Sequence, residues 1–353
     1  MNRADTLSRL AVLTRSSLFW PVTVLVVMLL GNVAFTHGFL AIHVRQGHLY
    51  GSLIDILLFG APLILVALGM TIVIATGGID LSVGAIVAIS GALACYLISN
   101  GQGLVVAIGV TVVVSLLLGL WNGLLVTRLG IQPIIATLIL MVAGRGIAQL
   151  ITGGQIITIN DKSYKLIGGG YWLGLPFAII LVAIALAATI VLTRRTALGM
   201  LLESVGGNAE ASRLVGIRSA GLITLAYVFC GLCAGIAGLM ISSNTLSADA
   251  NHAGLWIELD AILAVVLGGT ALTGGRFSLA GTIVGALIIQ TLDTTIYTAG
   301  IPPRTTLVFE AVVVTIVCLL QSPAFRAKIM RRGPGGGRAA APAPANAEQE
   351  VTA

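Results

Sequence analysis

A run of polar and small residues interrupts the apolar first half of the chain: Ala75-Thr76-Gly77-Gly78-Ile79-Asp80-Leu81-Ser82-Val83-Gly84. Long hydrophobic runs flank it on both sides and leave no room for a conventional loop. A carboxylate at the centre of a membrane helix costs about 2.5–3.5 kcal/mol, and non-helical backbone survives there only where protein or a water-filled cavity surrounds it. Such a break indicates a transport pathway. The alternative is a tight interfacial turn in which Asp80 or Ser82 caps the next helix.

A second polar group inside an apolar run is Arg145, which has a glycine on each side. A buried Arg normally faces the interior of a helix bundle and pairs with a carboxylate or with carbonyl oxygens, and the two glycines allow other helices to come close. Its candidate partners are Asp80, Asp293 and Glu310. Arg145 therefore either forms an ion pair that fixes helix packing or contacts a substrate directly.

A charged segment, residues 194–220, separates two apolar runs in the second half. We expect a short helix from about Asn208 to Leu214, with Asn208 as its cap and with Glu210 and Arg213 on one side. Such a helix next to a glycine would form a rigid knob that a partner protein can push. The alternative is an ordinary charged connector.

The composition identifies the class of protein that must position these residues. Of the 353 residues, 57% are hydrophobic and only 9% are charged, and the mean hydropathy is +1.05. Because soluble domains carry about 25% charged residues, the chain is predicted to be an all-α polytopic membrane protein. About 20 apolar residues cross a bilayer, which gives ten predicted spans. They cover residues 18–36, 54–76, 83–99, 104–127, 131–152, 176–193, 221–243, 258–275, 278–299 and 305–321.

The eighth predicted span begins with Glu258 and Asp260 and ends in paired glycines, so we expect that it does not cross as one straight helix. Paired glycines thus interrupt both halves, at Gly77-Gly78 and at Gly268-Gly269 and Gly274-Gly275. This weak similarity between the two halves of the sequence indicates an internal repeat with a substrate route between its halves.

Charge asymmetry orients the spans. With the N-terminus in the cytoplasm, most of the 19 Lys and Arg residues fall on the inner side, as the positive-inside rule requires. Ten spans then place both termini in the cytoplasm, which accounts for the net charge of +6 without nucleic acid. We predict a cytoplasmic N-terminus at 1–17, a permease domain at 18–321 and a cytoplasmic tail at 322–353. The tail is low in complexity and is predicted to be disordered from about residue 333; its basic start suits anionic lipid.

Several kinds of site are not predicted. The chain has no G-x-x-x-x-G-K-[ST] motif, so ATP hydrolysis by this chain itself is not expected. No nucleophile–base constellation stands out, because Ser82 lies near Asp80 but has no His nearby in the sequence. The four His residues lack metal-ligand spacing. Cys230 and Cys233 form a C-x-x-C pattern without a redox context, which favours small packing residues over a disulfide or a metal site. We therefore expect no catalytic residue, no metal and no cofactor.

Several motifs together carry a family resemblance. The stretch Met70–Ala85 resembles the hallmark of sugar ABC-importer permeases of the ribose type, and so do Gln132–Leu138, Ala143–Gly146, Asn208–Ile217 and Glu258–Thr270. The resemblance covers about residues 50–321. Within the family, Tyr50–Leu57 and Leu138–Gly146 look most similar to the galactofuranose permeases.

The resemblance implies a bacterial inner-membrane subunit with several partners: a cytoplasmic ABC ATPase that binds the ATP, a periplasmic sugar-binding protein, and a second permease that is either another copy or a paralogue. It implies that a monosaccharide such as galactofuranose or ribose passes through by alternating access. The pathway residues would be Thr76, Asp80, Ser82, Asn122 and Arg145. The ATPase would dock on Glu210, Ala211, Ser212, Arg213 and Gly216.

One residue departs from the family pattern, because ribose-type relatives tend to carry a basic residue where this chain has Glu310. The alternative function is an ion-coupled secondary sugar transporter. It would need a titratable group on the pathway, for which Asp80, Asp293 and Glu310 are available. A neighbouring gene for a P-loop ATPase would separate the two functions.

Overall fold

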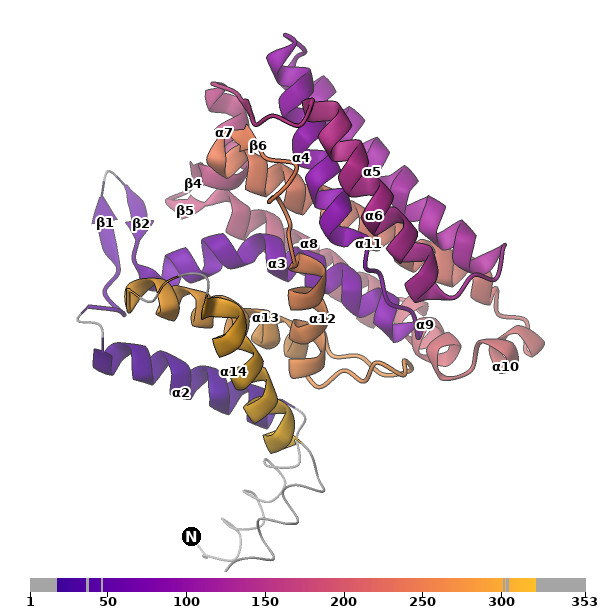
Figure 1. Cartoon of the computed structure of the whole chain (residues 1–353). Helices are drawn as coiled ribbons and strands as arrows, with labels where there is room; N and C mark the ends of the chain where they lie inside the picture. The colour runs from indigo at the N-terminus through magenta and orange to yellow at the C-terminus, as the bar shows by residue number, and fades with distance from the viewer. Residues whose placement is uncertain (1–17, 36–37, 46, 301, 303–304, 322–353) are drawn as a thin grey trace, which may run out of the picture.

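The structure, a computed structural model, describes residues 18–35, 38–45, 47–300, 302 and 305–321. The predicted N-terminal segment 1–17 and the predicted tail 322–353 lie outside these residues. Helices make up most of the described chain (Figure 1). They are α2 (Phe19–Phe35), α3 (Ser52–Ala75), α4 (Val83–Ser99), α5 (Leu104–Thr127), α6 (Pro133–Thr152), α7 (Lys162–Gly169), α8 (Phe177–Arg194), α9 (Leu198–Gly207), α10 (Ala209–Leu214), α11 (Ser219–Thr245), α12 (Ile257–Leu267), α13 (Leu279–Thr298) and α14 (Thr306–Gln321).

Nine of the ten predicted spans coincide with a helix to within a few residues. Six of these helices are long and apolar enough to cross a membrane, namely α3, α5, α6, α8, α11 and α13. Helices α2, α4 and α14 are apolar but shorter. The eighth span becomes α12, which has only 11 residues and is therefore roughly 16 Å long at 1.5 Å per residue. As expected, it does not cross as one helix. The protein is thus a mostly helical, multi-pass membrane protein, while the count of ten crossings and the side of the termini stay predictions.

Helices α3 and α11 form the centre of the bundle. In the apolar stretch of α3 that could cross a membrane, 78% of the residues are buried inside the protein, against 22% in α5 and in α8. A helix that is apolar all round suits such a position. Small residues let α11 approach its neighbours: a Cβ at Gly231 would lie 2.9 Å from the Cα of Gly119 on α5. This close packing is the usual way in which membrane helices associate.

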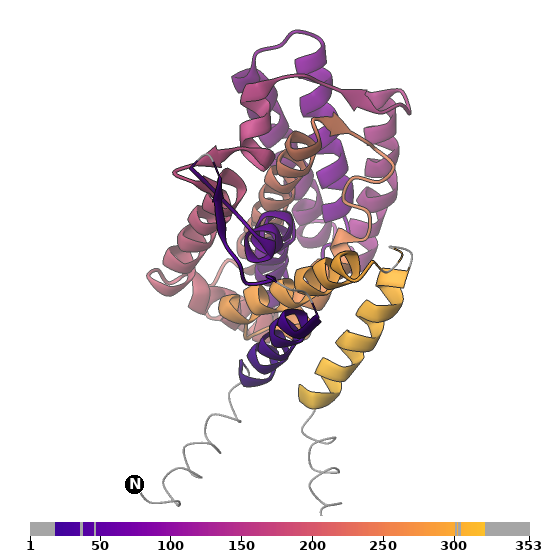
Figure 2. The same ribbon diagram turned by 90° about the vertical axis from the view of Figure 1, so that its left-hand side faces the viewer.

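A second group of helices packs beside this centre. Helices α2 and α14 lie next to α13 in both views (Figures 1 and 2). Helix α12 joins α13 through glycines, because a Cβ at Gly285 would overlap the carbonyl oxygen of Ala264. The half-length α12 is therefore held against a full-length helix.

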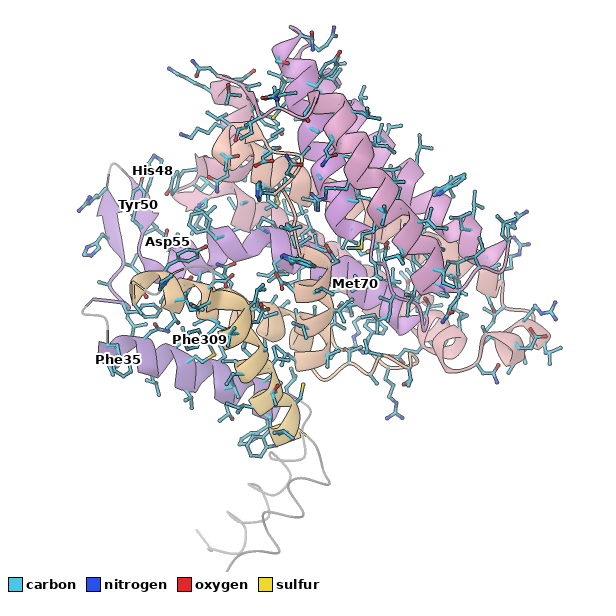
Figure 3. The ribbon with its side chains drawn as sticks, viewed as in Figure 1. Phe35, His48, Tyr50, Asp55, Met70 and Phe309 are labelled. Carbon is cyan, nitrogen blue, oxygen red and sulfur yellow. The ribbon has the colours of Figure 1, made fainter. Side chains whose placement is uncertain are left out.

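Three short antiparallel ribbons were not predicted from the sequence. They pair β1 (His43–Arg45) with β2 (His48–Tyr50), β3 (Ile157–Thr158) with β6 (Ser247–Ala248), and β4 (Tyr171–Trp172) with β5 (Leu175–Pro176). The ring of Tyr171 lies 4.5 Å from that of His48 and 5.3 Å from that of Tyr50, both labelled in Figure 3. The β1–β2 hairpin lies at the left edge of Figure 1 and α10 at the right edge. The hairpin and the predicted docking segment thus occupy opposite ends of the molecule.

Candidate functional site

The break is the non-helical segment of residues 76–82 between α3 and α4. Asp80 is the centre of a buried polar cluster between this break and α5. Its Oδ1 accepts hydrogen bonds from the backbone N–H and the hydroxyl of Ser82, at 3.0 and 2.6 Å. The side-chain amide of Asn122 donates to the Ser82 hydroxyl at 2.7 Å and lies 3.5 Å from the same Asp80 oxygen. All three side chains are 0% exposed. The structure therefore brings these three predicted residues together, as a cross-link within the bundle.

Further helices contact the same break. The thiol of Cys230 on α11 lies against the Asp80 carboxyl group, whose Oδ2 accepts no hydrogen bond of normal geometry from the described residues. The hydroxyls of Tyr227 on α11 and Thr137 on α6 both donate to the backbone oxygen of Ile79, each at 3.4 Å. Three helices thus hold the seven residues between α3 and α4, which is what non-helical backbone needs at membrane depth.

The break contains a tight turn, but not the predicted side-chain cap. Ser82 is the N-cap residue of α4, and its hydroxyl makes no capping bond. Asp80 instead accepts the N–H of Ser82 itself, a local turn of the kind that Asp residues favour. The hydroxyl of Thr76 returns to the carbonyl oxygen of Val73 at 2.7 Å, so this residue closes the last turn of α3.

Four glycines form a junction between the end of α3, helix α9 and the loop after α12. This glycine junction consists of Gly77, Gly206, Gly274 and Gly275. The N–H of Gly275 donates to the carbonyl oxygen of Ala75 at 3.0 Å, and a Cβ at Gly274 would lie 2.8 Å from the nitrogen of Gly77. A Cβ at Gly206 would overlap the Ala75 oxygen. The predicted glycine interruptions of the two halves thus touch, and α9 touches both.

Arg145 on α6 holds the loop between α11 and α12. Its guanidinium group donates to the carbonyl oxygens of Ala250 and Ala253, at 3.1 and 2.6 Å. Those residues belong to a non-helical stretch, whose carbonyl groups need partners away from water. Arg145 therefore acts as a clamp on this loop.

The predicted partners of Arg145 are wrong. The carboxyl groups whose charge reaches it are those of Glu258 and Asp249, whereas the sequence suggested Asp80, Asp293 and Glu310. The Asp80 carboxyl group bonds to Ser82 instead. Asp293 and Glu310 lie together elsewhere, between α13 and α14. The interpretation of Arg145 as a packing group is the one that its contacts support.

The starts of α4 and α12 face one another. Glu258, in the first turn of α12, is 2% exposed, and a Cβ at Gly84 in the first turn of α4 would overlap its Oε2. A carboxylate beside the positive end of a helix is favourable. Trp256 precedes α12 with a φ of 67°, and its side chain stays exposed. Both Glu258 and Arg145 thus fix the point at which this half-length helix begins.

The predicted short helix in residues 194–220 is confirmed. It is α10, and the side chain of Asn208 accepts the N–H of Ala211 at 2.9 Å as its cap. Arg213 and Glu210 lie on one side of this helix, as predicted, and form an ion pair at 2.6 Å. Their hydrogen bond and the Glu210 charge raise the pKa of the Arg213 guanidinium above its ordinary value.

Apolar side chains at the end of α10 point into solvent. Leu214 is 78% exposed and Val215 is 76% exposed, and Gly216 then reverses the chain with a φ of 90°. Ser212 is buried beneath them, and its carbonyl oxygen accepts the N–H of Ile217 at 3.0 Å. The segment thus presents a charged pair and an apolar tip on a rigid turn.

Comparison with known proteins decides which family this arrangement belongs to. Residues 52–318 match the family described as "Branched-chain amino acid transport system / permease component". The chain belongs to this permease family. The matched region contains helices α3 to α13 of the permease and most of α14. It therefore includes the Asp80 cluster, the glycine junction and α10.

Curated relatives of the permease carry names from sugar import. The galactofuranose transporter permease protein YtfT of Escherichia coli K12 is 49% identical over 87% of this chain and 91% of its own length. The fructose import permease protein FruF of Bifidobacterium longum is 41% identical, over 88% and 89%. The ribose import permease protein RbsC of Bacillus subtilis is 41% identical, over 72% and 80%. The resemblance to ribose-type sugar permeases is thereby confirmed. No solved structure matches the permease.

The Arg145 clamp gives the first testable expectation. Arg145→Ala leaves the carbonyl oxygens of Ala250 and Ala253 without this donor, and a buried unpaired group costs about 1–3 kcal/mol. We expect a lower midpoint of thermal unfolding, measured with a maleimide dye that reacts with the buried thiols as they become exposed. Arg145→Lys keeps the charge, but its differently shaped side chain does not place an N–H donor where Nη1 of Arg145 donates to both oxygens. Its midpoint should therefore lie between those of the wild type and Arg145→Ala. An unchanged midpoint in Arg145→Ala would contradict the clamp.

Sequence reasoning missed the residues that complete these sites. Cys230 and Tyr227 look like ordinary packing residues of an apolar helix, and Gly206 is one glycine among 44. The pairing of Arg145 with carbonyl groups had a signal in the sequence. The polar stretch before α12 is not helical, so its buried backbone carbonyl groups need hydrogen-bond donors from elsewhere in the protein.

Proposed function

We propose that the permease is the transmembrane subunit of a bacterial ATP-driven sugar importer in the inner membrane. The observation that carries this proposal is the 49% identity with a galactofuranose permease over 87% of the chain. The family description mentions amino acids, but relatives that align over most of the chain are named for galactofuranose, fructose and ribose. The sugar is therefore a monosaccharide, with galactofuranose the first to test.

The proposed assembly contains two membrane halves, a cytoplasmic ABC ATPase and a periplasmic sugar-binding protein. The second half would be another copy of this chain or a paralogue. ATP would bind to the ATPase subunit, since this chain lacks a P-loop motif. Strong sugar binding would belong to the external protein, because a tight site inside the membrane would slow release.

Helix α10 is the proposed docking knob for the ATPase. Its exposed tip, Leu214 and Val215, offers apolar contact, and the Glu210–Arg213 pair offers charge. Helix α9 connects this knob to the glycine junction, where it touches both the end of α3 and the loop after α12. Movement of the knob would therefore act directly on the two broken parts of the bundle, as a rigid-body switch between outward and inward access.

The sugar pathway is proposed to follow the break between α3 and α4. Asp80, Ser82 and Asn122 are 0% exposed in the conformation described, so contact with a sugar requires the break to open. Thr76 stands at its edge with 9% exposure. Arg145 is half-buried and bonds to the loop before α12, so in the pathway it would position that loop.

The docking proposal is tested with Leu214→Glu plus Val215→Glu, measured as ATP-driven sugar uptake and as co-purification of the ATPase. Because both side chains are exposed, the variant should insert and fold normally while it loses ATPase binding and uptake. Leu129→Glu is the matched control, since this residue is 69% exposed in the loop between α5 and α6. Uptake that persists without any ATPase and follows a proton or sodium gradient would instead establish the ion-coupled alternative.

A further inference from the structure

An apolar cavity lies between α3, α8, α9 and α11, next to the helix that leads to the docking knob. Its volume is about 270 Å³. Its lining includes Ile72 of α3, Leu198 and Leu202 of α9, and Phe229 of α11. A cavity with such walls stays free of water and accepts apolar molecules.

The two polar side chains in the lining are already hydrogen-bonded to the backbone. The hydroxyl of Thr189 donates to the carbonyl oxygen of Ala185 at 2.7 Å, and the hydroxyl of Thr193 donates to that of Thr189 at 2.7 Å. A site for a polar ligand needs placed donors and acceptors to orient it. The cavity therefore suits a hydrocarbon chain and not a sugar.

The cavity opens onto the outer surface of the helix bundle. Leu192 of α8 and Leu225 of α11 both line it, and they are 46% and 49% exposed. Both helices are long and apolar enough to cross a membrane. Apolar side chains on the outside of such helices face lipid tails, which are as apolar as leucine, so an acyl chain can enter from the side.

Two arginines lie at one end of this cavity. Arg195 is the C-cap residue of α8, three residues after Leu192, and Arg218 is the N-cap residue of α11, four residues before Leu222. Because residues three or four apart share a helix face, each arginine continues a face that lines the cavity. Both are exposed, and neither side chain has an ion pair or a hydrogen bond with any residue that the structure describes.

The acidic residues nearby in the sequence do not cancel this positive charge. From residue 177 to residue 245 they are only Glu203 and Glu210. Glu210 is paired with Arg213. Glu203 follows the lining residue Leu202 by one position, so it lies about 100° away from it around α9. The end of the cavity is thus a place for an anion.

We propose that the cavity binds an acyl chain of an anionic phospholipid, and that Arg195 and Arg218 hold the phosphate of its headgroup. An apolar space that ends at two free guanidinium groups matches a molecule with an apolar tail and an anionic head, and arginine forms paired hydrogen bonds with phosphate. The lipid belongs to the leaflet that adjoins α10. The site is independent of which sugar is carried.

A lipid bound there would stabilise the position of α9. This helix forms one wall of the cavity and packs against α3, α8 and α11. It also connects α10 with the glycine junction. The acyl chain therefore fills space beside the segment that joins the docking knob to the broken part of the bundle.

The test is native mass spectrometry of the full chain in a neutral detergent, titrated with phosphatidylglycerol or with phosphatidylcholine of the same acyl chains. We expect the first phosphatidylglycerol to bind at least about tenfold more tightly than phosphatidylcholine. Arg195→Ala plus Arg218→Ala should weaken phosphatidylglycerol binding about 30-fold, because each basic residue near anionic lipid contributes roughly fivefold. Since both side chains are exposed, this variant should fold normally.

Arg128→Ala plus Arg276→Ala is the matched control. It removes two other exposed arginines, and thus the same charge, away from the lining of the cavity. Its affinity for phosphatidylglycerol should equal that of the wild type. Equal affinity of the wild type for both lipids, or equal losses in the two double variants, would overturn the proposal.

A further variant tests the cavity separately from the arginines. Ala226 lines the cavity and is 1% exposed, so Ala226→Leu fills space that the acyl chain needs and should weaken phosphatidylglycerol binding while both arginines remain. Ala220→Leu makes the same change at an exposed position of α11 and should have no effect. Glycerol phosphate, which has no acyl chain, should not compete in the wild type. If it competes as well as the whole lipid, the arginines bind only an anion and the cavity assignment is wrong.

Discussion

Asp80→Ala is expected to lower the free energy of unfolding of the permease by about 3 kcal/mol and to abolish uptake. The substitution removes the acceptor for the N–H and hydroxyl of Ser82 and for the amide of Asn122, all of which are buried. Each orphaned buried donor costs about 1–3 kcal/mol, although these donors share one site and partly relax. The midpoint of thermal unfolding, followed through the thiols of buried Cys95, Cys230 and Cys233, measures this loss.

Two further variants show whether the loss belongs to the cluster. Asp80→Asn keeps the oxygen that Ser82 uses and places an N–H₂ group where Oδ2 lacks a normal hydrogen bond, so it should lose only a small part of the stability. Asp161→Ala removes an Asp that also accepts two backbone N–H groups, at the N-cap of α7, and should cost about 1 kcal/mol. If Asp80→Ala is no worse than Asp161→Ala, the cluster does not hold the break.

Local features of this chain could be predicted from its sequence. The helix after Asn208 needs only a cap that accepts the N–H three residues further on and an ion pair between residues three apart, so its signals lie within seven residues. The apolar runs likewise fix nine helices, because backbone hydrogen bonds in lipid must be satisfied within the segment. The short α12 was recognisable from Glu258 and Asp260 at one end and the paired glycines at the other.

Features that depend on contacts between distant residues could not be predicted. Arg145 bonds to carbonyl groups more than a hundred residues away, and the sequence does not show which carbonyl groups of the polar stretch before α12 face it. The ribbon of β3 and β6 joins residues 157–158 to 247–248 through two residues each, which is too short for any alternation pattern. The burial of Glu310 depends on how α14 packs against its neighbours, which hydropathy does not determine.

Gly206→Ala is expected to uncouple ATP hydrolysis from uptake, with uptake falling at least about tenfold while ATPase binding persists. A Cβ at this position overlaps the carbonyl oxygen of Ala75 and would lie 2.6 Å from the nitrogen of Gly275. These are backbone atoms that cannot rotate away, so α9 must shift from the end of α3. Strain of this kind amounts to about 1–3 kcal/mol. If it acts on only one of the outward and inward access states, it would change the equilibrium between them by roughly 5–150-fold.

Gly207→Ala is the matched control for this substitution. Its Cβ would meet no atom beyond its own helix within 4 Å, while both substitutions remove a glycine from α9 and gain the same helix propensity. Any difference between the two variants therefore measures the glycine junction itself. ATPase activity and sugar uptake are compared in the same vesicles. Equal coupling in both variants would show that the knob acts on the bundle by another route, whereas loss only in Gly206→Ala places the mechanical link between α9, the end of α3 and the loop after α12.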